Sequence, residues 1–481
     1  MNYAIVFYML GFICNVEALL MLLPLTVGIF YHEPVVETFV IPIVLLLAVG
    51  TVLTRKRPQK QRFYAREGFF IVSLCWIVLS AFGALPLLMS GQCPSFIDCF
   101  FETVSGFTTT GASILPNVEI FNKSVLFWRS FTHWIGGMGV LVFVLTVLPL
   151  AGQSSIHLMR AESPGPIVGK LLPKLRSTAM LLYGIYMGLT ALLVLLLCFG
   201  GMSLYDSFIF AFGTAGTGGF ANYAASVGHF NSPYITWVIT VFMALFGINF
   251  NVYYLLLFGK AAQAFKSEEV RWYLGIIVAA TALVTFNIRH LYDSLGLALR
   301  HAAFQVSAII TTTGFSTADF VQWPTFSRSI LLLLMTIGAC AGSTGGGIKT
   351  SRVVIGVKAA GQSLRRLLHP RTATCVRLEG NRVEEETIST VGSYLTLYLM
   401  IVIVSVLVVS LEGYDFETTF TAVLTCFNNV GPGMSLVGPT QNFSFFSGLS
   451  KLVLSLDMLL GRLEIFPMLV LLSPSIWKKS R

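Results

Sequence analysis

Charged residues are scarce in this sequence. Only 11% of its 481 residues are Asp, Glu, Lys or Arg, whereas 55% are hydrophobic, and the mean hydropathy is +0.78. A soluble domain needs a polar exterior, so a chain this apolar cannot hide its hydrophobic surface within a water-soluble fold. Apolar runs of about 20 residues, enough to cross about 30 Å of hydrocarbon as a helix, recur at 68–90, 178–202, 234–258 and 391–411. We therefore expect an all-α polytopic membrane protein with roughly ten crossings.

The common signatures of catalysis are also missing. The sequence contains no HExxH, no P-loop lysine and no GxGxxG after a strand. His133, His290 and His301 stand alone without metal-ligand spacing, and we interpret them as packed or interfacial side chains. Of eight cysteines only Cys93 and Cys99 share an external segment, which favours scattered buried thiols over a disulfide. Because a membrane-embedded enzyme would need paired buried acids or histidines, we expect neither catalysis nor a cofactor.

Lys and Arg are absent from the first 54 residues, so the N-terminus lacks the basic region of a secretory signal. Further along, 23 of the 31 basic residues fall in five clusters, at 55–66, 160–176, 260–271, 352–382 and 478–481. Basic residues collect in cytoplasmic loops, so the net charge of +9 reflects topology, and we expect no nucleic-acid partner. Residues 1–60 then form a transmembrane hairpin in which Asn15 and Glu17 must face protein, because a carboxylate is costly in lipid.

Polar strings containing glycine interrupt the apolar chain at four places, each midway between two basic clusters. They are Thr108, Thr109, Thr110 and Gly111; Gly216, Thr217, Gly218 and Gly219; Thr311, Thr312, Thr313 and Gly314; and Asn428, Asn429, Val430 and Gly431. Each follows an amphipathic segment too short to cross a bilayer and precedes a long apolar one. Ser95, Ser203, Asp293 and Asp415 are the predicted N-caps of these short helices.

This pattern predicts four membrane-pore-membrane repeats with pseudo-fourfold symmetry around one pore. The expected boundaries are 66–155, 175–260, 270–360 and 387–478. With the caps outside, each short helix directs its negative C-terminal end toward the membrane centre. The extended string then offers main-chain carbonyls that can replace the water shell of a cation. Glycine permits the positive φ that inward-pointing carbonyls require, and the threonine hydroxyls add further oxygens.

The strings resemble the selectivity filter of the Trk/Ktr/HKT superfamily of potassium transporters, and within it the TrkH family, over all four repeats. The matching pairs are Thr110-Gly111, Gly218-Gly219, Thr313-Gly314 and Val430-Gly431. The extra N-terminal hairpin is similar to the one that distinguishes TrkH from the shorter KtrB subunits. The resemblance implies potassium uptake across a bacterial inner membrane, with potassium bound as substrate at the sixteen string residues. Serine in place of the first filter glycine accompanies sodium permeation in this family, so Gly111 implies a preference for potassium.

A further break occurs in the third repeat, where an apolar helix meets Gly342, Ser343, Thr344, Gly345, Gly346 and Gly347. We interpret these residues as a gating loop, which the resemblance also implies; a helix kink is the alternative. Lys349 either anchors this loop or marks the cytoplasmic border, and the border interpretation is favoured. For Arg462, within the last apolar run, the resemblance implies contact with the gating loop. An ion pair with Asp457 or Glu464 is the other interpretation, and the two do not exclude each other.

The internal segment 351–386 adjoins the gating loop, which makes it a candidate docking site. The resemblance implies a cytoplasmic nucleotide-binding regulatory subunit similar to TrkA, and a homodimer of the membrane subunit.

Three alternatives to gated potassium uptake remain. They are a sodium- or proton-coupled symporter on the same scaffold, a membrane-embedded enzyme, and a scaffold subunit that conducts nothing.

Overall fold

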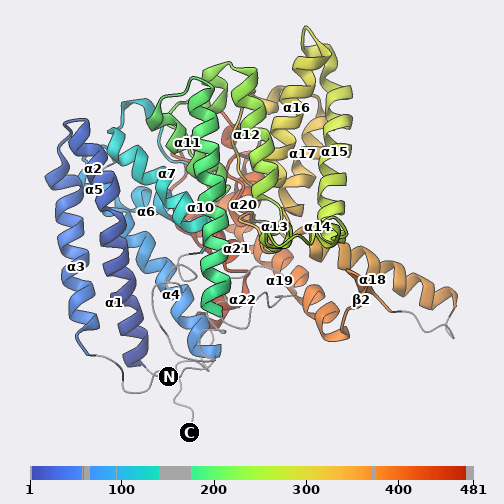
Figure 1. Cartoon of the computed structure of the whole chain (residues 1–481), viewed down its shortest axis with the longest axis horizontal. Coiled ribbons are helices and arrows are strands. Elements are labelled where there is room, and N and C mark those ends of the chain that lie inside the picture. The colour runs from blue at the N-terminus through green and yellow to red at the C-terminus, as the bar shows by residue number, and fades with distance from the viewer. Residues whose placement is uncertain are drawn as a thin grey trace.

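The computed structural model describes residues 3–56, 58, 65–93, 95–139, 175–369 and 375–472, and they form a bundle of helices (Figure 1). Six described helices are long and apolar enough to span a membrane, and a seventh is added if the bent pair α12 (Pro233–Phe246) and α13 (Phe250–Leu257), at 93°, counts as one span. The expectation of an all-α membrane protein is confirmed. The number of membrane crossings, expected to be roughly ten, stays a prediction.

The first helices form an antiparallel pair at one edge of the bundle (Figure 1). They comprise α1 (Tyr3–Leu20), α2 (Leu22–Phe30), the π-helix Val36–Val40 and α3 (Ile41–Thr54). Close approach of α1 and α3 depends on small residues, since a Cβ on Gly50 would lie 2.8 Å from the backbone oxygen of Gly11. Glu17 is buried in protein, as predicted for a carboxylate at membrane depth.

Four successive units follow, and each contains a short helix, a glycine-bearing loop and a further helix. The first has α4 (Ala65–Gly83), α5 (Leu85–Met89), α6 (Phe96–Phe107), the 3-10 turn Val118–Ile120 and α7 (Lys123–Gly137); the second has α10 (Leu175–Phe199), α11 (Leu204–Gly216), the 3-10 turn Ser226–Phe230, α12, α13 and α14 (Ala261–Phe265). The third has α15 (Glu268–Ile288), the turn Arg289–Leu291, α16 (Leu295–Ile310), the turn Phe320–Gln322, α17 (Thr325–Ile337) and α18 (Thr350–Leu368). The fourth has α19 (Glu385–Val409), the turn Ser410–Glu412, α20 (Phe416–Phe427), the turn Ser435–Val437, α21 (Gly448–Arg462) and α22 (Phe466–Leu472).

Between α18 and α19 lies a two-stranded antiparallel hairpin of β1 (Arg377–Leu378) and β2 (Asn381–Arg382), with Arg377 opposite Arg382. Figure 1 shows α18 projecting sideways from the bundle with this hairpin beside it. The predicted boundaries of the units stay predictions. Residues 140–155 and 473–478, the expected ends of the first and fourth units, lie outside the described residues, as do parts of the basic clusters.

The short helices begin at side-chain caps. Ser95, Ser203 and Asp415 each accept a hydrogen bond from the backbone N–H three residues further on, as predicted. In the third unit the prediction of Asp293 was wrong by one residue. Ser294 has the extended backbone of a cap and accepts from Leu297 N at 3.2 Å.

Two pairs of neighbouring units are joined by an ion pair between the helix that follows the glycine-bearing loop of one unit and the short helix of the next. Lys451 of α21 lies 2.6 Å from Asp98 of α6, and Arg328 of α17 pairs with Glu417 of α20. These contacts close the chain of units from the third to the fourth and from the fourth back to the first.

The N-terminal pair is joined to the first unit by the carboxylate of Glu33. It accepts hydrogen bonds from the backbone N–H of Lys123 at 2.6 Å and of Ser124 at 3.0 Å, the first residues of α7. The first N–H groups of a helix have no partner within the helix, so this carboxylate stabilises α7 as a cap from another segment.

We predict that Glu33→Ala lowers the apparent melting temperature of the detergent-solubilised protein by an amount on the order of 2 °C, the effect of losing about 1 kcal/mol of capping. Glu37→Ala removes an exposed carboxylate from the same connection and is the matched control. Equal shifts for the two variants, read by intrinsic fluorescence, would show that Glu33 stabilises nothing.

Candidate functional site

The four glycine-bearing segments adopt one backbone conformation. The residue two before the glycine is left-handed in each of them, at Thr109, Thr217, Thr312 and Asn429 with φ of 57°, 56°, 58° and 56°. The glycines Gly111, Gly219, Gly314 and Gly431 follow with φ of 80°, 77°, 75° and 96°. Four segments distant in sequence therefore share a turn geometry that ordinary loops would not reproduce by chance.

Each segment begins where a short helix ends. Thr110 N–H donates to Ser105 O at 2.8 Å and Thr109 N–H to Gly106 O at 3.1 Å, a helix-terminating arrangement that satisfies two of the last carbonyls. The same pair of bonds recurs after α11, α16 and α20. The carbonyls of each string come directly after the C-terminal end of a short helix. The negative electrostatic potential of the four helix ends adds to that of these carbonyls.

The four segments meet in a closed ring, which we call the glycine ring (108–111, 216–219, 311–314 and 428–431). A Cβ on Gly111 would lie 1.9 Å from Gly218 O, and one on Gly219 would lie 1.9 Å from Thr313 O. A Cβ on Gly314 would lie 2.2 Å from Val430 O, and one on Gly431 would lie 2.7 Å from Thr110 O. Each glycine thus abuts the carbonyl that precedes the glycine of the next unit, and the fourth abuts the first.

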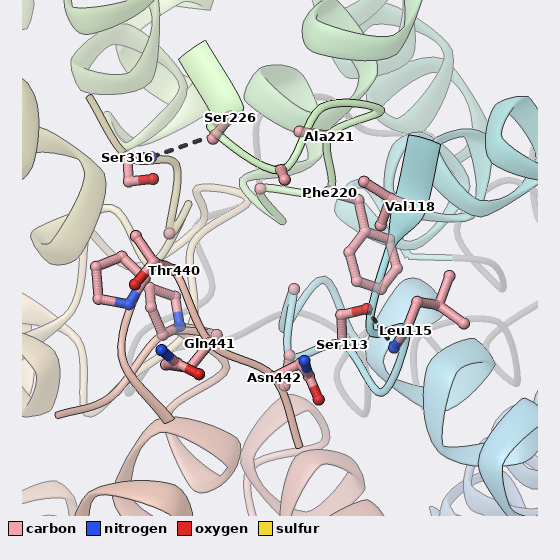
Figure 2. A pocket seen from close by; sticks show the side chains of 18 of the residues that line it. Ser113, Leu115, Val118, Phe220, Ala221, Ser226, Ser316, Thr440, Gln441 and Asn442 are labelled. Atoms are coloured by element: carbon pink, nitrogen blue, oxygen red, sulfur yellow. Dashed lines mark hydrogen bonds between the residues drawn. The ribbon is translucent and has the colours of Figure 1, made fainter. Parts of the chain in front are cut away.

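On one side the ring opens into a cavity of about 130 Å³. All four ring glycines line it, together with the segments that follow them, and Figure 2 shows Ser113, Phe220, Ser316 and Gln441 placed around it. Ser316 N–H donates to Ser226 Oγ at 3.3 Å, so the rims of the second and third units are linked directly. Of the sixteen predicted site residues, the four glycines line this cavity, and the other twelve belong to the strings that carry those glycines.

A buried ion pair links the segments that follow the first and second strings, and its Arg129 also lines the cavity. Arg129 Nε lies 2.5 Å from Glu102 Oε1, and both side chains are buried. Glu102 also accepts from Ile114 N at 2.8 Å, and Arg129 donates to Ala221 O at 3.0 Å. The pair therefore ties the ends of the first and second strings together. Sequence reasoning missed it, although two ionisable residues in apolar segments were an available signal.

His133 makes a second such link. It is buried, as predicted for a packed histidine, with Nδ1 2.7 Å from Gly106 O and Nε2 accepting from Phe220 N at 3.2 Å. A Cβ on Gly218 would lie 2.4 Å from its ring. The imidazole thus packs behind the second string and bridges it to the end of α6, a role that its isolated position in the sequence did not reveal.

The predicted gating loop lies against the opposite side of the ring. Helix α17 ends at Ile337, and Gly338 then takes a φ of 70°. A Cβ on Gly346 would lie 2.5 Å from Asn428 O, and one on Gly345 would lie 3.1 Å from Thr311 O. Residues 342–347 are therefore not a kink within a continuous helix. They form an irregular segment in direct contact with the ring.

Both ends of this loop are held by one carboxylate. Glu269, at the start of α15, accepts from Ala341 N at 2.7 Å and from Ser351 N at 3.1 Å. Cys340 N–H donates to Gly247 O at 3.1 Å, and Gly342 O accepts from Phe250 N at 3.0 Å, at the bend between α12 and α13. Backbone that leaves a helix at membrane depth needs such partners, because no water satisfies it.

Two cations contact the loop. Lys349 is buried and donates to Gly345 O, a contact that supports the interpretation that it anchors the loop. Its place at the cytoplasmic border stays a prediction. Arg462 donates to Thr344 O at 2.9 Å, to Gly137 O at 2.8 Å and to Gly136 O.

The acidic neighbours of Arg462 have other contacts. Glu464 pairs with Arg352, and Asp457 accepts from Ser405 at 2.8 Å. Arg462 therefore bridges the loop to the end of α7, and this contact agrees with the gating-loop interpretation rather than with the proposed ion pairs.

The chain as a whole has counterparts among known proteins. A family model described as TrkH, cation transport protein, matches residues 36–479. The chain belongs to the TrkH family. The family is one of cation transporters and not of enzymes, and no group of three or more His, Cys, Asp or Glu residues able to hold a metal ion occurs in the described part of the chain.

Individual TrkH relatives match the chain along almost its whole length. It is 36% identical over 468 residues to the Trk system potassium uptake protein TrkH of Salmonella typhimurium, covering 95% of this chain and 96% of that protein. It is 34% identical over 487 residues to TrkH of Vibrio parahaemolyticus, covering 99% and 100%. The crystal structure of the potassium transporter TrkH from Vibrio parahaemolyticus superposes with a TM-score of 0.89 at 32% identity, covering 99% of this chain and 100% of that one.

We predict that Gly111→Ser reduces discrimination between rubidium and sodium by about tenfold, which corresponds to about 1.4 kcal/mol. The added Cβ would overlap Gly218 O, so the second string must move and its carbonyl leaves its position. Uptake of the two ions into proteoliposomes measures the ratio. Gly91→Ser is the matched control, because Gly91 also has a positive φ of 71° but nothing lies within 4 Å of its Cβ position. An unchanged ratio in Gly111→Ser would contradict the steric argument.

Proposed function

We propose that this chain takes up potassium through the glycine ring, which acts as a selectivity filter, and that residues 342–347 gate the passage. The observation that carries the proposal is the closed sequence of contacts in which each ring glycine abuts the carbonyl of the next unit. The printed names of its TrkH relatives, which are potassium uptake proteins, support the same function.

The chemistry follows from the oxygens at the ring. The side chains of Thr108, Thr110, Thr311 and Thr313 are engaged in hydrogen bonds with one another and with helix carbonyls. Main-chain carbonyls therefore supply the ligands that replace the water of a potassium ion, and the four helix termini lower the electrostatic cost of the dehydrated cation. No carboxylate belongs to the ring, so an ion is bound weakly enough to leave.

The gating loop blocks this path where it rests against the ring. It is built of small residues that allow close contact, and its backbone is held by Glu269, Lys349 and Arg462. Displacing it requires breaking these bonds together, and the cation of Arg462 adds a repulsive charge beneath the ring. Opening of the passage therefore requires a conformational change that displaces the loop, transmitted through one of its two ends.

Segment 351–386 is suited to deliver that pull. Helix α18 begins at Thr350, directly after the loop, and Lys358 on it pairs with Glu268 at the start of α15. We propose that a nucleotide-binding subunit resembling TrkA docks here, and that two copies of the membrane subunit form a homodimer in the bacterial inner membrane. The Trk system names of the relatives support the partner, and the clustered basic residues support the topology.

Reconstitution tests the function directly. We predict that the purified chain in proteoliposomes takes up rubidium in preference to sodium, and that the reversal potential of its current does not change between two pH values. A shift with pH would indicate proton coupling, the symporter alternative. Absence of flux with and without a regulatory subunit would reject transport altogether.

Deleting residues 343–347 should raise basal rubidium uptake, because the segment that rests against the ring is removed. Size-exclusion profiles in detergent show whether the deleted protein is folded, and retained preference for rubidium over sodium shows whether the ring is intact. A folded and selective variant that is no leakier than the parent would contradict the assignment of the gate.

A further inference from the structure

The left-handed residue of each ring string is an unexpected place for a side chain. Glycine normally occupies this position after a helix, because a left-handed residue with a Cβ costs about 1–2 kcal/mol. Three strings nevertheless have threonine there, at Thr109, Thr217 and Thr312, and the fourth has Asn429. A β-branched residue is especially strained in this region. A side chain retained at such a cost points to a task for its polar atom.

The four polar groups differ in what they contact. Thr217 Oγ1 donates to Gly216 O at 2.6 Å, within its own string. Asn429 Nδ2 donates to Thr110 Oγ1 and to Met458 O, each at 2.9 Å. Thr109 Oγ1 is buried and has no hydrogen-bond partner among the described residues. Thr312 Oγ1 accepts from Gly346 N–H at 2.7 Å.

The contact of Thr312 therefore differs in kind. Within the described part of the chain, it is the hydrogen bond that joins the glycine ring directly to residues 342–347. The other bonds of this loop reach the bend after α12, the carboxylate of Glu269, and the side chains of Lys349 and Arg462. Those bonds hold the loop to the surrounding helices, whereas the bond of Thr312 holds it to a string of the glycine ring.

We propose that Thr312 is a latch that positions the gating loop against the third ring string and couples the state of the gate to that string. The inference rests on the proposed function and extends it to a residue whose role is positioning. Its hydroxyl is fully buried, so the bond does not compete with water. The bond also directs the loop backbone against Asn428 and Asn429, where only glycine at 346 fits.

Coupling follows from the shared bond. When the loop leaves, Thr312 Oγ1 loses its donor while the strained backbone beside it remains, so the third string changes its environment. If closing the loop changes the free energy of ion binding at this string, then ion binding changes the free energy of closing by the same amount, because the two equilibria are linked. One neutral hydrogen bond corresponds to a change of roughly two- to tenfold in that equilibrium.

The first test uses three variants in the full-length chain and in the chain lacking residues 343–347. Thr312→Val keeps the β-branched shape and removes only the hydroxyl, Thr312→Ser keeps the hydroxyl, and Thr109→Val removes the equivalent hydroxyl of the first string. Rubidium uptake into proteoliposomes is measured for each. We expect Thr312→Val to raise basal uptake roughly two- to tenfold in the full-length chain and to have no such effect without the loop.

Thr312→Ser should retain the low uptake of the parent, which would show that the hydroxyl and not the methyl group is responsible. Any change caused by Thr109→Val should be the same with and without the loop, because Thr109 Oγ1 makes no hydrogen bond to the loop or to any other described residue. If Thr312→Val changes uptake equally in both backgrounds, or not at all, the latch is rejected while potassium uptake stands.

A second readout does not depend on transport. Hydrogen exchange, followed by mass spectrometry of the full chain in nanodiscs, reports on the Gly346 amide. Thr312→Val should accelerate its exchange roughly two- to tenfold, whereas Thr312→Ser and Thr109→Val should leave it protected. Equal exchange in the parent and Thr312→Val would overturn the proposal even if no variant conducts, so failure of the latch and failure of the function are separable.

Discussion

The close approach of four backbones at one point is the constraint on which the rest of this structure depends. Each ring glycine lies where a Cβ would collide with the carbonyl oxygen of the next unit. A carbonyl can face a shared axis only if its neighbour leaves that space empty, and only a residue without a side chain adopts the required positive φ without strain. The capped short helices lead into the four strings, and the ion pairs of Lys451 with Asp98 and of Arg328 with Glu417 join neighbouring units.

Bringing irregular backbone to membrane depth creates a second requirement. Every N–H and C=O that leaves a helix must find a partner in protein, because hydrocarbon offers none. Glu102, Arg129 and His133 meet this need around the ring, and Glu269, Lys349 and Arg462 meet it around the gating loop. These six residues inside the bundle thus bind main-chain atoms as well as one another.

Several features could be predicted because their signals are local. The four strings, the capping residues Ser95, Ser203 and Asp415, and the break at 342–347 follow from composition and from spacing along a helix. Other features were missed or assigned wrongly. Asp293 was preferred to Ser294 as a cap, since both residue types favour that position. The contact of Lys349 with Gly345 O was the less favoured interpretation, because Arg352 lies nearby in sequence and suggested the cytoplasmic border.

The sequence by itself determined the membrane environment, the helical class, the place of each string and the family. Hydropathy, charge distribution and motif residues are properties of the chain that do not depend on how it folds. Tertiary structure alone decided that Gly111 meets Gly218, that Arg462 reaches Gly137 and Thr344, and that Thr312 rather than Thr109 contacts the loop. These partners are far apart in sequence, and residue type does not distinguish among three threonines with the same backbone conformation. Only the packing of the four units places one of them within hydrogen-bond distance of Gly346.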